Sequence, residues 1–416
     1  MSPRVLLLEL FQAAVAAAQP ALRIPPFLPP PPRGRTIVVG AGKAAAHMAA
    51  ALEAAWRGSL QGVVVTRYGH AVPCRHIRVL EAAHPIPDQN SLAAAREMRR
   101  QVSGLTKDDL VIALISGGGS ALLAEPVPGI SLEDKQQVTQ AMFRAGATIR
   151  ELNRVRQALS LIKGGGLAAA AYPAQVLTLA ISDVPGDDPA FIASGPTVPP
   201  PEADMTPADI IANLGVRLPA HVEKALARHV SRSPQDFSHC HTELIATPMQ
   251  SLLAAAEKAR AFGVTPLILS DCIEAEAREA ALVHAGIVQS VRRHGLPMAP
   301  PVVILSGGEC KVTIGDAGAG RGGRNTEFLL ALGLALREEK NIHAIACDTD
   351  GIDGSEDNAG ALWLPDSLER ARQAGIDPAQ HLAKHDSYSA FAALGDLVMT
   401  GPTQTNVNDF RAMLIQ

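Results

Sequence analysis

The feature that most constrains the fold is a series of short, continuous apolar segments, most of which are followed at once by a loop of Gly, Ser, Asp or Asn. Clear examples are Thr36–Gly40, Leu110–Ile115 and Val176–Ile181. Apolar runs of this kind, without alternation, are typical of strands that are buried on both faces. Helical patterns separate them, and alternating strands and helices predict a parallel, doubly wound sheet in a three-layer, Rossmann-like α/β domain.

The length of the chain predicts two domains, because 416 residues exceed the usual size of one hydrophobic core. A proline-rich stretch follows Pro196, and a new series of strands and helices begins near Thr242. We therefore expect a Rossmann-like N-terminal domain over residues 1–235 and a second, smaller α/β C-terminal domain over residues 236–416. The later strands are predicted at Pro266–Leu269, Val302–Leu305, Ile342–Cys347 and Asp396–Thr400.

The first residues indicate a helix and then an extended connection. Apolar residues between Val5 and Ala18 recur at helical spacing and are interrupted by Glu9, which favours an amphipathic helix over a signal peptide. Seven prolines within residues 20–32 predict an extended segment. No stretch reaches about 18 uninterrupted apolar residues, so we expect no membrane-spanning segment.

Composition excludes several kinds of partner. The chain has 37 Lys and Arg against 41 Asp and Glu, without a basic stripe, and only 3% of its residues are aromatic. Nucleic acid is therefore not expected as a partner, because neither a polycationic surface nor a platform for stacking bases is present. The five cysteines are far apart and include no C-x-x-C pair, which is typical of reduced thiols and favours a cytoplasmic protein. The sequence leaves open whether the protein forms a homodimer.

The loop after the first strand, which runs from Gly40 through Gly42 and Lys43, fits the pattern of a dinucleotide-binding turn at a helix N-terminus. The acidic residue that binds the ribose of NAD is missing after the second strand, where Arg67 would suit only a 2′-phosphate. The positive charge of Lys43 lies at the positive end of the helix dipole, which is unfavourable by about 0.3–1 kcal/mol. A bound anion at this position would make the interaction favourable. We interpret Lys43 as a residue that faces an anionic ligand.

Two further loops follow strands of the same predicted sheet. The first contains three consecutive glycines, each costing about 0.5–1 kcal/mol to order, which favours a cradle of backbone N–H groups for an anion over a plain turn. This cradle comprises Ser116, Gly117, Gly118, Gly119 and Ser120. In the second loop, Asp183 and Asp187 are four residues apart and suit a magnesium site, a base or an ordinary turn.

The predicted C-terminal domain carries two loops of related composition. Segments 306–309 and 318–325 place glycines beside Arg321 and Arg324, which can approach a phosphoryl group closely and bidentately; the alternative is a flexible hairpin with solvated arginines. The phosphate-binding residues expected here are Gly307, Gly308, Gly322, Gly323 and Asn325. The loop that begins at Asp348 lacks the residues of a calcium-binding EF-hand, but its Asp350 suits magnesium.

Taken in order, these motifs resemble those of the glycerate 2-kinase family with a MOFRL-type C-terminal domain, members of which are often labelled "putative hydroxypyruvate reductase". The resemblance covers most of the chain. It rests on segments 39–44, 66–70, 84–88, 115–121, 159–167, 182–188, 193–197, 305–309, 322–325, 349–354 and 395–408. The sequence departs from the family pattern at Gly166, where a long polar residue is common, at Lys311, where threonine is usual, and at Thr326, where glutamine is usual.

The resemblance implies a kinase that transfers a phosphoryl group from ATP, with Mg²⁺, to the 2-hydroxyl of D-glycerate. Such a transfer depends mainly on positioning and on neutralising charge. Lys43 and Arg324 are therefore expected to stabilise the migrating phosphoryl group or to bind the glycerate carboxylate, with Arg321 as a further cation. The expected magnesium ligands or hydroxyl-activating residues are Asp183, Asp187 and Asp350, of which Asp183 is the catalytic candidate.

Two alternatives remain at this point. An NADPH-linked hydroxypyruvate reductase is favoured by the Gly40-x-Gly42 turn and by Arg67, but it leaves the other four loops unexplained. A non-catalytic sensor of sugar phosphates would bind the same ligands without turnover.

Overall fold

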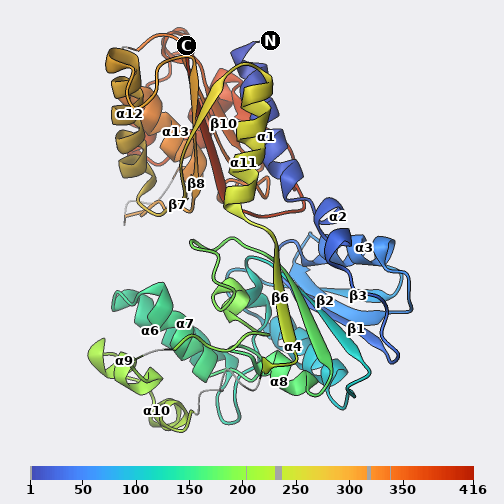
Figure 1. Cartoon of the computed structure of the whole chain (residues 1–416). Helices are drawn as coiled ribbons and strands as arrows, with labels where there is room; N and C mark the ends of the chain where they lie inside the picture. Colours follow the sequence, from blue (N-terminus) through green and yellow to red (C-terminus); the bar gives the residue numbers. More distant parts are fainter. Residues whose placement is uncertain (1, 203, 230–236, 316–319, 338) are drawn as a thin grey trace. The chain divides into compact units, whose positions relative to one another are not determined.

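The computed structural model describes residues 2–202, 204–229, 237–315, 320–337 and 339–416. They form two compact units, each built around its own sheet (Figure 1). The unit made of Pro20–Ile245 is called the N-terminal unit below. The C-terminal unit is made of Met1–Gln19 together with Ala246–Gln416. The predicted α/β fold class is confirmed in both units.

The N-terminal unit contains a six-stranded sheet in the order β3-β2-β1-β4-β5-β6, in which β1 to β5 run parallel. The order 3-2-1-4-5 is that of a doubly wound sheet. The strands are β1 (Thr36–Ala41), β2 (Gln61–Arg67), β3 (Ile77–Ala82), β4 (Leu110–Ile115), β5 (Gln175–Ile181) and β6 (Cys240–Ala246). The sequence did not predict β3, because Arg78 and Glu81 interrupt its apolar pattern.

Register brings the functional loops of this unit to one edge. Ala41 of β1 lies beside Val65 of β2 and Ile115 of β4, and Ile115 lies beside Ala180 of β5. The chain therefore leaves four neighbouring strands at the same level. The helical segments are α2 (Pro20–Arg23), η1 (Pro25–Phe27), α3 (Ala45–Ala55), α4 (Gln89–Val102), α5 (Gly119–Leu122), α6 (Leu132–Arg144), α7 (Ile149–Ala158), α8 (Gly166–Ala171), η2 (Ile192–Ser194), α9 (Pro207–Asn213) and α10 (Ala220–Ala227).

The C-terminal unit has a mixed sheet in the order β11-β10-β9-β12-β8-β7, in which β7 and β8 are parallel and the other pairs are antiparallel. Its strands are β7 (Thr265–Ile273), β8 (Val302–Gly308), β9 (Ile342–Asp348), β10 (Gly360–Trp363), β11 (Leu397–Val398) and β12 (Asp409–Ile415). The predicted strand Asp396–Thr400 is only the two residues of β11. The sequence did not predict the central strand β12, in which Arg411 occupies a buried position.

Helices cover both faces of the C-terminal sheet (Figure 1). They are α1 (Pro3–Ala17), α11 (Pro248–Ala261), α12 (Ala277–His294), α13 (Arg324–Ala335), α14 (Ser367–Gln373), α15 (Pro378–Ala383) and α16 (Ser387–Leu394). Val303 and Leu305 of β8 pack with α1 and α11, whereas Val302 and Ile304 pack with α12 and α13. This alternation follows from the period of two in a strand and produces three layers.

The units differ from the predicted division at residue 235, which itself lies outside the described residues. Helix α1 belongs to the C-terminal unit, where Leu7 and Phe11 are buried and Ser251 Oγ donates to Ala14 O at 2.8 Å. Strand β6, predicted to begin the second series, lies beside β5 at the edge of the first sheet. An apolar pattern predicts a strand but does not identify the sheet that the strand joins.

The proline-rich segment 20–32 begins with the short helical turns α2 and η1 rather than with an extended chain. Prolines 20 and 25 stand at the first positions of these turns, where a backbone N–H is not needed. Within the described residues no single helix is long and apolar enough to cross a membrane. In the part of the chain that the structure describes, one bent pair of helical segments, Pro3–Ala17 and Pro20–Phe27, reaches that length and apolar character when the two are taken together.

His284 gives the C-terminal unit a pH-dependent stability. Burial lowers the pKa of His284 to about 4, and the ring contacts Ala280 O at 2.7 Å and Ser306 Oγ at 2.9 Å. Since the unfolded state binds more protons between pH 6.5 and 4, stability falls as the pH falls through this range, by roughly 3 kcal/mol in all. We expect the unfolding free energy of His284→Gln to lose this dependence. His294 is an exposed residue on the same helix, and the variant His294→Gln should retain the pH dependence. Equal dependence of the unfolding free energy on pH in both variants would contradict the account.

Candidate functional site

The first two glycine-rich loops lie against each other at the carboxyl edge of the N-terminal sheet. Gly42 has a φ of 138°, and a Cβ atom there would lie 2.1 Å from Ser116 Oγ. The N–H of Lys43 donates to Gly117 O at 2.8 Å, and the N–H of Ala44 donates to Ser116 Oγ at 3.1 Å. The two predicted loops therefore form one hydrogen-bonded structure.

This arrangement bears on dinucleotide binding. A pyrophosphate in a Rossmann-type site is bound by the backbone N–H groups at the start of the first helix. Here the N–H groups of Lys43 and Ala44 already donate to the second loop, and that of Ala45 donates to Gly42 O at 3.1 Å. Gly42 permits this close approach of two loops, which is a packing reason for the glycine pattern.

Gly118 lies at the centre of the predicted anion cradle. Its φ is 78°, a conformation that favours glycine. A Cβ atom on Gly118 would lie 3.0 Å from His84 Nε2 and 3.2 Å from Lys43 Cγ, so both side chains flank this glycine. Sequence reasoning did not include His84 among the site residues, although its position just after β3 is a usable indication.

The loops that follow β5 complete this edge. The side chains of Asp183 and Asp187 are half-buried there, and Asp187 has a φ of 56°. Gly119 packs against Ala193, because a Cβ atom on this glycine would lie 2.6 Å from Ala193 Cβ. Ser194 Oγ lies 2.7 Å from Ser120 Oγ. Four loops thus meet where the parallel strands end.

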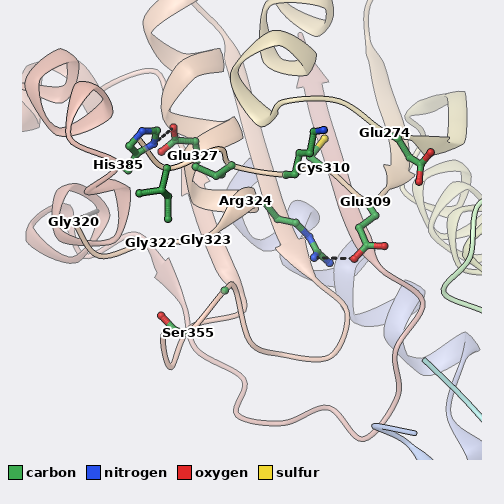
Figure 2. Close-up of a pocket in the computed structure, with 14 residues that line it drawn as sticks. Glu274, Glu309, Cys310, Gly320, Gly322, Gly323, Arg324, Glu327, Ser355 and His385 are labelled. Atoms are coloured by element: carbon green, nitrogen blue, oxygen red, sulfur yellow. Dashed lines mark hydrogen bonds and ion pairs between the residues drawn. The ribbon is translucent and has the colours of Figure 1, made fainter. Parts of the chain in front are cut away.

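The C-terminal unit contains a separate cavity of about 570 Å³ at the start of α13 (Figure 2). The predicted residues Gly322, Gly323 and Arg324 line it, together with Lys311. Residues that were not among the predicted site residues also line it; they are Glu274, Glu309, Cys310, Val312, Ile314, Gly320, Glu327, Gly354, Ser355 and His385. Gly318, which belongs to the predicted arginine loop, lies outside the described residues.

Arg324 is the central cation of this cavity. Its guanidinium contacts Asp409 at 2.6 Å, Asp348 at 2.8 Å and Glu309 at 3.3 Å. Burial alone would lower the pKa of Arg324, but these three carboxylates hold it well above its usual value. Figure 2 shows Arg324 and Glu309 pointing toward each other at one side of the cavity. The guanidinium is thus held in a fixed orientation by carboxylates from three strand ends.

Asp409 links Arg324 to the interior of the sheet. One carboxylate oxygen accepts from Arg324 Nε at 2.6 Å and from Asn325 Nδ2 at 2.8 Å. The other accepts from the Cys310 N–H at 3.1 Å and from Arg411 Nη2 at 2.5 Å. Burial would raise the pKa of Asp409, but Arg324 and Arg411 hold it below its usual value. Nothing in the sequence pattern identified Asp409 or Arg411.

A second buried carboxylate, Glu327, lies at the other side of the cavity. It is paired with Arg278. The ring nitrogen His385 Nδ1 lies 3.0 Å from the Glu327 carboxylate (Figure 2). Glu327 follows Arg324 by three positions on α13, so the two side chains start from neighbouring positions on the surface of the same helix. The cavity therefore has an ion-paired residue at each side.

The predicted glycines of this unit have packing roles. Gly307 and Gly308 lie within β8 and pair with Phe410 and Asp409 of β12 rather than forming an open loop. A Cβ atom on Gly323 would lie 2.3 Å from Asp353 Oδ1. Asp353 also accepts from the Asn325 N–H at 2.9 Å, so a protein carboxylate already binds the start of α13.

The remaining predicted residues lie elsewhere. Arg321 stacks on the Tyr388 ring at 4.0 Å and pairs with Glu356 at 2.6 Å. Asp350 is buried, and its Oδ1 accepts from the Ile352 N–H at 2.9 Å. Among the described residues, no group of three or more His, Cys, Asp or Glu side chains is arranged to hold a metal ion.

The departures from the family pattern have local explanations where the structure gives contacts. Thr326 Oγ1 donates to Asp353 Oδ2 at 2.8 Å and accepts from the Gly323 N–H at 3.1 Å, so threonine provides the acceptor for the first backbone donor at this helix start. Gly166 is buried at the start of α8. Lys311 has an exposed side chain at the cavity.

The fold and these loops define a Rossmann-like α/β protein with a second, mixed α/β unit. Residues 6–227 match the model of a domain of unknown function, DUF4147, and residues 302–409 match the MOFRL family. The chain belongs to the glycerate kinase family, and it is an enzyme of that family.

Relatives of this chain carry two kinds of name. A protein of Agrobacterium vitis named "Putative hydroxypyruvate reductase" is 56% identical over 416 residues, which cover 100% of this chain and 95% of that protein. The D-glycerate 2-kinase of Thermotoga maritima is 36% identical over 100% of this chain and 99% of its own length. The crystal structure of a glycerate kinase from the same organism matches with a TM-score of 0.90 at 34% identity and covers 99% of both chains.

The buried role of Asp409 predicts a large loss of stability on its neutralisation. In Asp409→Asn the carboxylate that balances Arg324 and Arg411 is lost, and breaking a buried ion pair in this way costs about 3–5 kcal/mol. Denaturant unfolding measures this change. The control is Asp366→Asn, since Asp366 is 63% exposed and pairs with Arg370 at 3.2 Å; its loss should be about 0–1 kcal/mol. Equal, small effects of both variants would contradict the role of Asp409.

Proposed function

We propose that this protein is a D-glycerate 2-kinase, which transfers a phosphoryl group from ATP to the 2-hydroxyl of D-glycerate and releases ADP. The observation that carries the proposal is the end-to-end similarity to the Thermotoga maritima D-glycerate 2-kinase. A glycerate 2-kinase of Pyrococcus horikoshii is also 39% identical over 90% of this chain. Membership of a kinase family supports ATP as the phosphoryl donor.

The proposed roles follow from charge and position. Phosphoryl transfer requires cations that neutralise the transferring group and hold it in line. Lys43, which flanks the Gly118 cradle, is assigned to the phosphoryl group or to the glycerate carboxylate. Arg324, held by three carboxylates, is assigned the same kind of role in its own unit. Arg321 is a weaker candidate, because Glu356 and Tyr388 already engage it.

Mg²⁺ is part of this proposal as the partner of the ATP phosphates. Protein-bound Mg²⁺ usually takes only one or two carboxylates beside phosphate oxygens and water, so single aspartates fit this role even without a cluster of ligands. Half-buried Asp183 and Asp187 are the better candidates, with Asp183 as the residue that would also activate the hydroxyl. Asp350 fits less well, since it is buried and bound to its own turn.

Two observations favour the alternative, an NADPH-linked hydroxypyruvate reductase: the name of the 56% identical protein of Agrobacterium vitis, and the side chain of Arg67. Nε and Nη2 of Arg67, at the end of β2, have no hydrogen-bond partner among the described residues, and unused guanidinium donors are the kind of group that binds a 2′-phosphate; both nitrogens are, however, buried. Against it, the N–H groups that should face the pyrophosphate already bond to the second loop. We therefore rank the kinase first.

A paired assay separates the two activities. Purified protein is incubated with D-glycerate, ATP and Mg²⁺ in one reaction and with hydroxypyruvate and NADPH in another. We expect ADP formation that depends on D-glycerate, and no oxidation of NADPH above the rate without enzyme. Oxidation of NADPH that depends on hydroxypyruvate, without ADP formation, would contradict the proposal.

Loss of the Lys43 ammonium should strongly lower turnover. For Lys43→Met we expect kcat/KM for the kinase reaction to fall by roughly 10³-fold or more, the size typical of removing a cation that stabilises the transferring phosphoryl group. The matched control is Lys107→Met, which removes an exposed lysine from the same unit. A folded Lys43→Met enzyme with a nearly normal rate would remove this assignment.

A further inference from the structure

The outward face of α12 is apolar at its centre. Leu282 is 54% exposed and Val283 is 64% exposed, and both lie near the middle of the helix. The inward face of α12, which carries mainly alanines and valines, is buried in the core of the C-terminal unit. Figure 1 shows α12 at the outside of this unit. Within the described residues, the two large apolar side chains of the outward face are therefore left in contact with solvent.

Gly286 lies on the same outward face. It follows Leu282 by four positions and Val283 by three, so the three residues are neighbours on the helix surface. A Cβ atom on Gly286 would meet no heavy atom of the described residues within 4 Å, so packing inside the unit does not require a glycine there. Glycine inside a helix costs about 0.5–1 kcal/mol relative to alanine. A second helix that packs on this face would supply a reason for it, because a missing side chain lets two helix axes approach closely.

The charged residues of this face are placed symmetrically about Gly286. Glu279 precedes Gly286 by seven residues and Arg293 follows it by seven, and seven residues are about two helical turns. Both side chains are exposed; Arg293 contacts Glu339 through Nη2 at 3.3 Å and is still 62% exposed. Arg278, which precedes Glu279 in the chain, is held by a buried carboxylate at the cavity instead. The outward face thus has a negative charge at its start and a positive charge at its end.

We propose that this outward face of α12 is the interface of a homodimer, in which the two copies of the helix pack antiparallel about a two-fold axis at Gly286. In a two-fold interface each residue of one copy meets a residue of the other, and the same contact is repeated with the copies exchanged. Antiparallel packing therefore places Glu279 of one copy beside Arg293 of the other, and this ion pair occurs twice. Leu282 and Val283 of each copy lie between the axis and one ion pair, where the facing helix covers them.

Charge selects the antiparallel arrangement over a parallel one. In a parallel pair Glu279 would face Glu279 and Arg293 would face Arg293, and like charges that face each other across an interface oppose association. One pair of helices offers less surface than the roughly 800 Å² per partner of a standard protein interface. We therefore expect a dimer with a micromolar dissociation constant, which dissociates on dilution. The proposal concerns association alone and does not depend on the proposed function.

Sedimentation velocity of the full chain, from low to several hundred micromolar concentrations, tests the proposal. The wild-type protein should change from monomer to dimer as its concentration rises. Glu279→Arg and Arg293→Glu each place like charges opposite each other, so each variant alone should dimerise at least tenfold more weakly. An equimolar mixture of the two variants should associate again, because each arginine of one variant then meets a glutamate of the other. The control is Glu257→Arg on α11, which covers the other face of the sheet; it removes an exposed glutamate and should behave as the wild type.

Gly286→Gln gives a second readout, in which stability and association change in opposite directions. Glutamine is a better helix former than glycine and would meet no atom near its Cβ, so the melting temperature of the diluted monomer should rise. The same side chain should weaken the dimer tenfold or more, because it separates the two helices at the axis. A wild-type protein that stays monomeric at the highest concentration would overturn the proposal. So would a dimer that persists equally in both charge variants, or a mixture of these variants that does not associate.

Discussion

The bonds from the Lys43 and Ala44 N–H groups to the second glycine-rich loop are the interactions on which the N-terminal unit depends. They exist because β1 pairs directly with β4 in parallel, with Ala41 beside Ile115, so that both strands end at one level. Gly42 allows the two loops to touch, and the contact commits the backbone N–H groups that a dinucleotide would need. The same contact orders Gly118 beside Lys43 and His84. Parallel register thus determines which ligands this edge can accept.

In the C-terminal unit, the main feature is an arginine that is held at a cavity in a fixed orientation. A lone guanidinium on an exposed loop would keep its conformational freedom. Arg324 instead begins a helix and binds carboxylates from the ends of β8, β9 and β12, with Arg411 behind Asp409 to balance the charge. The planar guanidinium of Arg324 can donate two parallel hydrogen bonds to a phosphate or a carboxylate ligand, which is also how a guanidinium binds protein carboxylates. Buried ion pairs are costly alone, and here each oxygen of Asp409 accepts two hydrogen bonds.

The sequence predicts the elements that are determined by the pattern of neighbouring residues. Continuous apolar runs identify β1, β4 and β5, and the loops after them are found at the predicted edge. Pairing between distant segments is not local, so the sequence did not predict that α1 joins the C-terminal unit or that β6 closes the first sheet. Arg411 illustrates the limit for the site: it is a charged residue in the centre of β12, and only tertiary contacts explain its burial. Lys135 of α6 is likewise buried, although the sequence alone gives it the appearance of a surface residue.

The proposed function requires that the phosphoryl group of ATP is transferred to the 2-hydroxyl of D-glycerate. Phosphorus NMR of the product, with the coupling of phosphorus to the protons of the glycerate carbons, measures this directly. We predict one phosphomonoester signal coupled to the single proton at C2, which identifies 2-phosphoglycerate. Coupling to the two protons at C3 would contradict the account. So would the absence of any phosphorylated glycerate in a reaction with fully folded protein.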